Sequence, residues 1–263
     1  MHRARSLLLV ALAVIGGAVT LPLRSSPGEE ASPATRATGV VLRGYDAEGN
    51  AAWMVTAADG TIQADVGSLA SPEIVFYKAG REALRARSET LVSAGKEAVL
   101  RGNVVISSDD GYRLETDELV WNQSADLLTS HRVAIASEGV TVDAHEFLYL
   151  LNEDRWSVSE GFTATIDRPS LLRVVGKTLE GDGERLVLSG ELSIAGEDET
   201  YSCERIDYER ANEEVRLSGS VRGTLSWATL SADAITLTTA GSEATGAVRV
   251  VLEPGFFRSE NGA

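Results

Sequence analysis

Few residues of this 263-residue chain combine the types and spacing that could do chemistry. His145 and Glu146 begin the H-E-x-x-H pattern of a zinc protease, but Tyr149 stands where the second histidine should be. The acidic stretches "SDDG" and "GEDET" lack the D-x-D-x-D-G ligand pattern of a calcium loop. "GSVRG" lacks the spacing of a nucleophile elbow, and His131 lies in no acid–base motif. We therefore expect solvated turns and surface residues here, with no catalytic residue, no metal and no other cofactor.

The composition excludes other kinds of partner and site. A formal net charge of −15 argues against nucleic acid, because phosphate binding needs clustered Lys and Arg. A single cysteine, Cys203, cannot form an internal disulfide, and we interpret it as a small apolar residue within a strand. Three histidines are too few and too scattered for a His-rich metal site.

The first 24 residues predict export. Arg3 and Arg5 precede an uncharged run from Ser6 to Leu23, which has about the minimum length that crosses a bilayer. Two interpretations stay open, namely an uncleaved transmembrane helix with a cytoplasmic N-terminus and a signal peptide cut after a small residue such as Thr20. The length of the run favours the anchor. Residues 25–38, rich in Ser, Pro, Ala and charge, read as a flexible tether.

From residue 39 to residue 253 the pattern is one of strands and turns. Short runs with an apolar residue at every second position are separated by turn sequences such as "DAEGN", "AADG", "SSDDG" and "LNED". No stretch after Leu23 shows the 3.6-residue period of a helix, which argues against a parallel α/β sheet. We expect one all-β domain over residues 39–253, followed by a C-terminal tail, 254–263.

A short phrase, "LRGNVVI" at its first occurrence, recurs at a nearly constant interval. Successive members lie 27 to 30 residues apart, and a pair of apolar residues follows 16 to 19 residues after most of them. The glycine of the phrase, or the residue that takes its place, is the slot of each repeat, and the slots are Gly102, His131, Gly161, Gly190, Gly219 and Gly246. After Gly161 the alternation is one position out of step, so we expect a β-bulge there. Each unit then holds two short strands and two turns, and units must stack to bury their apolar faces.

These phrases resemble a known family. "LRGNVVI" followed by "YRLETDELVW" is similar to the OstA-like repeat of the periplasmic lipopolysaccharide-transport family that contains LptC and LptA. The order of anchor, tether, "GYDAEGNAAWMVTA", "PEIVFYKAG" and Gly-x-Val-x-Ile units resembles LptC over residues 39 to 252. The chain looks longer than an ordinary LptC, as though LptA-like units had been added after about residue 168.

The resemblance implies a fold and a function. The fold would be stacked antiparallel repeats forming an open, twisted β-jellyroll that holds the acyl chains of lipopolysaccharide between its two walls. The chain would be a non-enzymatic inner-membrane protein with one membrane pass and its bulk in the periplasm. It would accept lipopolysaccharide from an inner-membrane ABC transporter and pass it to an LptA-like bridge protein by edge-strand pairing at "AVRVVL", residues 247–252.

The resemblance also assigns the alternating apolar residues of the repeats to the lining of the lipid groove. These residues are Leu100, Val104, Ile106, Leu119, Trp121, Val133, Ile135, Phe147, Tyr149, Phe162, Ile166, Leu192, Ile194, Ile206, Tyr208, Val221, Ile235, Leu237, Val248 and Val250. A structural or adhesive β-solenoid with a dry core would show the same alternation. A glycan-modifying β-helix enzyme would need acid–base residues recurring at the repeat interval, and the sequence has none.

Overall fold

A computed structural model of the protein describes residues 34–63, 66–167, 171–238 and 240–253. All regular structure in these residues is β, which confirms the predicted class. No candidate membrane-spanning helix occurs among them. The expected anchor, most of the expected tether and the C-terminal tail lie outside the described residues.

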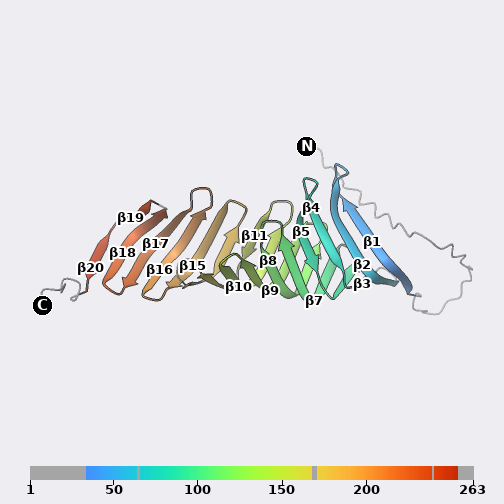
Figure 1. Ribbon diagram of the computed structural model, residues 1–263, viewed down its shortest axis with the longest axis horizontal. Helices are drawn as coiled ribbons and strands as arrows, with labels where there is room; N and C mark the ends of the chain where they lie inside the picture. Colours follow the sequence, from blue (N-terminus) through green and yellow to red (C-terminus); the bar gives the residue numbers. More distant parts are fainter. Residues whose placement is uncertain (1–33, 64–65, 168–170, 239, 254–263) are drawn as a thin grey trace, which may run out of the picture.

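Twenty strands in the described part of the chain form one antiparallel sheet. In Figure 1 they follow one another along the long axis of the molecule, from β1 at one end to β20 at the other. The strands are β1 (Thr35–Tyr45), β2 (Ala51–Gln63), β3 (Val66–Ala70), β4 (Glu73–Lys78), β5 (Arg81–Arg87), β6 (Thr90–Ala94), β7 (Glu97–Ser108), β8 (Arg113–Asn122), β9 (Leu127–Ser137), β10 (Val140–Leu150), β11 (Arg155–Val158), β12 (Phe162–Asp167), β13 (Leu171–Gly176), β14 (Thr178–Gly181), β15 (Arg185–Ala195), β16 (Glu199–Glu209), β17 (Glu214–Leu225), β18 (Ala228–Thr238), β19 (Gly241–Thr245) and β20 (Arg249–Leu252).

The sheet is bent lengthwise into two walls. A long strand such as β7 crosses both walls, since its first half pairs with β6 and its second half with β5. The strands β2, β10, β15 and β18 likewise pair with two short strands each. We call the wall that contains β3, β6, β11, β14 and β19 the first wall. The wall that contains β4, β5, β12, β13 and β20 is the second wall. Each wall ends, on the side opposite the bend, in a row of hairpin turns, which we call its rim.

The recurring sequence slot marks the bend. In β7, Gly102 and Asn103 both have positive φ, 77° and 45°, and the pairing with β8 shifts register at this point. The side chain of Glu89, from the neighbouring bend between β5 and β6, lies over the glycine. A Cβ on Gly102 would come within 2.5 Å of Oε2 of Glu89. Glycine is therefore required here both by the backbone angle and by the close approach of a neighbour.

The strands differ from expectation in three places. Four of the six repeats contain two strands of 10 to 12 residues, as in β7 and β8, instead of two short ones, because the bend lies inside a strand and only the rim turns interrupt the chain. At Gly161 the strand breaks into β11 and β12 instead of bulging. Gly161 has a φ of 106° and Phe162 is already extended, so the alternation resumes one residue earlier than in β7. At the N-terminal end, β1 begins at Thr35 and so includes the last four residues of the expected tether.

One hydrophobic cluster fills the space between the walls, from Val55 to Ile235. Trp121 of the first wall packs edge-on against Trp53 and Phe76 of the second wall, with ring centroids 5.2 Å and 5.0 Å apart. Among the described strands, β1 pairs only with β2, and β19 and β20 pair only with β18. The sheet therefore has one free edge at each end of the described chain.

Candidate functional site

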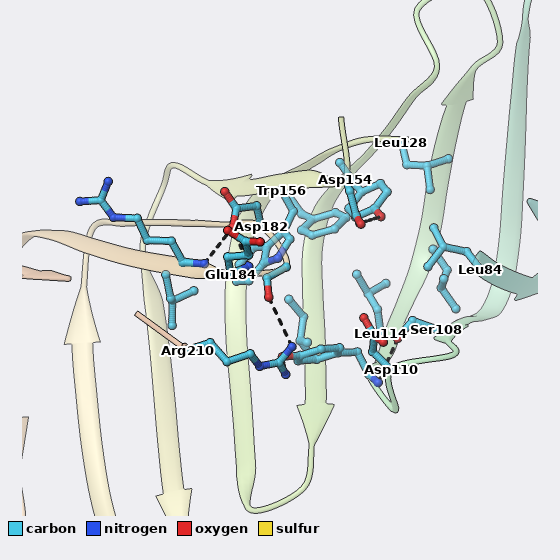
Figure 2. Close-up of a pocket in the computed structure, with 18 of the residues that line it drawn as sticks. Leu84, Ser108, Asp110, Leu114, Leu128, Asp154, Trp156, Asp182, Glu184 and Arg210 are labelled. Carbon is cyan, nitrogen blue, oxygen red and sulfur yellow. Dashed lines mark hydrogen bonds between the residues drawn. The ribbon is translucent and has the colours of Figure 1, made fainter. Parts of the chain in front are cut away.

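A cavity of about 190 Å³ lies between the two walls, beneath their rims and near the middle of the chain. The second wall contributes Leu84 of β5 and Leu114 of β8, and the first wall contributes Phe147 of β10, Trp156 of β11 and Leu186 of β15. Figure 2 shows Leu84 and Leu114 on one side of the cavity and Trp156 on another. Because apolar side chains of both walls converge on it, the cavity can hold an apolar chain.

Five of the expected groove residues border this cavity: Ile106, Ile135, Phe147, Tyr149 and Tyr208. Most of the others are buried in the core cluster without bordering the cavity, namely Leu100, Val104, Leu119, Trp121, Val133, Phe162, Leu192, Ile194, Ile206, Val221 and Ile235. Ile166 is partly buried and packs against the same cluster. The structure thus gathers a subset of the predicted lining at one place instead of spreading it evenly along the chain.

Three expected groove residues lie at the C-terminal end of the sheet and are exposed. They are Leu237, Val248 and Val250, with 41%, 45% and 52% of their surface accessible. Val250 pairs with Leu230, whose side chain packs against the core, so the two side chains face the same side of the sheet. Since β19 and β20 have no strand beyond them in the described chain, this last layer leaves its inner face open.

Sequence reasoning missed five apolar lining residues: Leu84, Leu114, Leu128, Trp156 and Leu186. Four of them pair directly with predicted ones across a hairpin. Leu114 pairs with Ile106, Leu186 pairs with Tyr208, and both Leu128 and Trp156 pair with Tyr149. Residues equally distant from a hairpin turn face the same side of the sheet, so the turn sequences contained this signal.

Polar side chains join the two rims above the cavity, across the opening between the rims that we call the mouth of the cavity. Nζ of Lys78, on the second wall, donates to Oδ2 of Asp154, on the first wall, at 2.9 Å, although 76 residues separate them. The hydroxyl of Tyr149 donates to the other oxygen of that carboxylate at 2.5 Å. Farther along the mouth, Arg210 of the first wall donates to the hydroxyl of Tyr112 on the second wall at 3.4 Å.

The electrostatics of this mouth favour fixed protonation states. Burial, together with the bond to Asp154, raises the pKa of the Tyr149 hydroxyl, which therefore stays a neutral donor. The hydrogen bond from Tyr149 and then that from Lys78 lower the pKa of Asp154 below its usual value. Since neither group changes its charge near neutral pH, the arrangement can hold and orient groups but does not supply an acid–base pair.

The other candidate residues lie apart from this cavity. Nδ1 of His131 contacts a carboxylate oxygen of Glu146 on the outer side of the bend, and 92% of the His131 side chain is exposed. Cys203 is buried in the core, and burial raises the pKa of its thiol. Within the described ranges, no group of three or more His, Cys, Asp or Glu side chains is placed to hold a metal ion.

Comparison with protein families matches residues 6–167 to the family described as "LptC: Lipopolysaccharide-assembly, LptC-related". The match covers more than half of the chain and ends with β12, whereas the hydrogen-bonded sheet continues through β13 to β20. Comparison with curated proteins finds no match.

Proposed function

The chain belongs to the LptC-related lipopolysaccharide-assembly family, and from this membership we propose that it is a conduit that holds the acyl chains of lipopolysaccharide between its two walls. The family implies a role in lipopolysaccharide transport and a location in the cell envelope or periplasm, and its members are transport proteins and not enzymes. The observation that carries the conduit proposal is the apolar cavity between the walls, beneath the rims.

Physical chemistry supports acyl chains inside and headgroups outside. Each methylene removed from water stabilises the complex by about 0.8 kcal/mol, so a chain of several methylenes needs no charge on the protein to bind. The chain has a net charge of −15, and the four carboxylates that border the cavity, Asp110, Asp154, Asp182 and Glu184, outnumber its two arginines, Arg185 and Arg210. Phosphate groups would be repelled from this mouth, whereas hydrocarbon would not.

We further propose the direction of transfer. The expected transmembrane helix would hold the N-terminal end beside an inner-membrane ABC transporter, and the free edge at β19 and β20 would dock an LptA-like bridge protein. Unpaired edges are templates for another strand, and natural edges are usually blunted by charge or covered. Val248, Val250 and Val251 are exposed at this edge, and Arg249 is the one charged residue within β20.

A structural β-solenoid with a dry core is the second candidate. The burial of most expected groove residues and the contact of Trp121 with Trp53 and Phe76 across the walls favour it. The two candidates differ in whether an acyl chain reaches the cavity lining.

A photo-crosslinking residue placed at Ile106 in the full chain decides between them. Ile106 borders the cavity, whereas Ser107, the next residue of β7, points to the outer face and is exposed. We expect lipopolysaccharide to be captured at position 106 and not at 107. Equal capture at both positions, or none at 106, would reject the conduit and leave the dry solenoid. The same comparison at Ile194 and Ser193, away from the cavity, tests whether the groove extends into the later repeats.

A further inference from the structure

The ion pair between Lys78 and Asp154 spans the mouth of the cavity from one rim to the other, and it does not join neighbouring strands of the sheet. Lys78 ends β4, whose partners are β2 and β5, while Asp154 lies in the turn before β11, whose partners are β10 and β14. The pair therefore joins rims that no backbone ladder connects at this point. By contrast, the pair Arg101–Glu118 joins the adjacent strands β7 and β8 within the first wall.

The ion pair between Lys78 and Asp154 is weak enough to break readily. The side chains of Lys78 and Asp154 are 49% and 50% exposed, and ion pairs with that exposure are weak and screened by salt. The only other rim-to-rim hydrogen bond found in the described residues, from Arg210 to the hydroxyl of Tyr112, is long at 3.4 Å. The two walls are thus held together at the mouth by bonds that cost little to break.

Tyr149 connects this contact to the cavity. It borders the cavity together with Phe147 and Trp156, and its hydroxyl ends on the carboxylate that Lys78 also binds. A chain that enters between the rims beside Asp154 has to pass the pair that this residue forms with Lys78. A chain in the cavity would lie against the Tyr149 ring, whose hydroxyl holds the Asp154 carboxylate, so Tyr149 links the occupant to the residue that Lys78 binds.

We propose that Lys78, Asp154 and Tyr149 form a latch that closes the mouth of the cavity, and that an acyl chain enters sideways, between the rims, when the latch opens. The proposal rests on the proposed function and adds the place and the control of entry. The ligand class is a hydrocarbon chain attached to a headgroup that stays at the rim.

The first test removes the charge of the latch. Asp154→Asn keeps an oxygen that can accept from Tyr149 but loses the ion pair with Lys78. We expect the full chain carrying this variant to take up the fluorescent apolar probe N-phenyl-1-naphthylamine about two- to five-fold faster than the wild type, as fits the loss of an exposed ion pair. Rising salt should accelerate uptake by the wild type and leave the variant unchanged. The matched control is Glu118→Gln, which breaks the Arg101 pair within one wall and should leave uptake unchanged.

The second test locks the latch. With cysteines at both positions, Lys78→Cys and Asp154→Cys, a short bismaleimide should join the rims and stop probe uptake, while the untreated double variant takes up probe freely. The wild-type chain treated in the same way is the control, because its single cysteine, Cys203, is buried and reacts slowly.

Unchanged uptake after crosslinking, or an Asp154→Asn variant with wild-type rate and salt response, would overturn the latch while leaving the conduit intact. Absence of probe uptake by the wild type, together with no capture of lipopolysaccharide at Ile106, would instead reject the conduit and the latch with it.

Discussion

Gly219 and Ser220 turn β17 from the first wall to the second, with φ values of 80° and 51°. The two positions are not equivalent. A Cβ on Gly219 would lie 2.6 Å from the Cβ of Glu204, the residue at the neighbouring bend of β16, whereas Ser220 carries its side chain at positive φ. The first position of the bend thus excludes a side chain because a neighbouring strand occupies that space.

We expect Gly219→Ala to lower the free energy of unfolding by about 1–3 kcal/mol, since it combines backbone strain with a steric clash. Gly67→Ala in β3 is the matched control, because Gly67 has no positive φ and no atom within 4 Å of an added Cβ. Urea denaturation of the three chains measures the effect. Equal stability of the two variants would show that the bend tolerates a side chain.

In the edge strand β20, alternate residues turn their backbone N–H and C=O groups away from β18 and leave them unpaired in the described chain. The N–H of Glu253 donates to the carbonyl of Trp227 at 2.9 Å, so these two residues form a hydrogen-bonded pair of the antiparallel ladder. Along an antiparallel ladder, hydrogen-bonded pairs alternate with pairs that share no hydrogen bond. Val251, paired with Thr229, is therefore the next residue of β20 that is hydrogen-bonded to β18. The N–H and C=O of Val250 point away from β18. Val250 therefore presents its backbone to whatever docks at this edge.

Val250→Pro should abolish binding of an LptA-like partner and leave the fold intact, because it deletes an outward donor without removing a bond to β18. Val250→Ala, which keeps the N–H, should bind like the wild type. Pull-down of the partner alongside a thermal melt checks both. Wild-type binding by a folded Val250→Pro chain would place the docking edge elsewhere, at β1 near Trp53.

Local patterns predicted the strands well, while the contacts between distant residues escaped them. Alternation between turn sequences indicated the segments that became β7 and β8, and the repeat interval located the positions, such as Gly102 and Gly219, at which the strands bend, because both signals lie within a few residues. The side chain that covers Gly102 belongs to Glu89, and the partner of Lys78 is 76 residues away. Such contacts depend on how the walls fold over, which alternation does not encode.

At the scale of the whole molecule, the core runs without interruption through the point where the family match ends. The side chains of Phe162, in β12, and Leu192, in β15, both lie over Gly176 of β13. In a stacked sheet each layer contacts mainly its neighbours, so a defect in one layer should weaken the adjacent layers first.

Leu192→Ala tests this coupling, because Leu192 is only 1% exposed. We expect a loss of about 2–5 kcal/mol in the free energy of unfolding. Amide hydrogen exchange should show the largest loss of protection in β12 to β16 and the smallest in β1 and β2. Val251→Ala, at an exposed position, is the control and should change stability by less than about 0.5 kcal/mol. An equal loss of protection in β1 would show that the sheet unfolds as a single unit.

The pairing of β12 with β13 carries a kinetic consequence. It is the same antiparallel backbone ladder by which two separate proteins could join edge to edge, but both strands belong to one polypeptide. The fraction of molecules in which β12 is paired with β13 is therefore independent of protein concentration, and the pairing needs no bimolecular association step. Under the proposed function, a joint at β19 and β20 would obey mass action, so the abundance of the docking partner would govern assembly at that end.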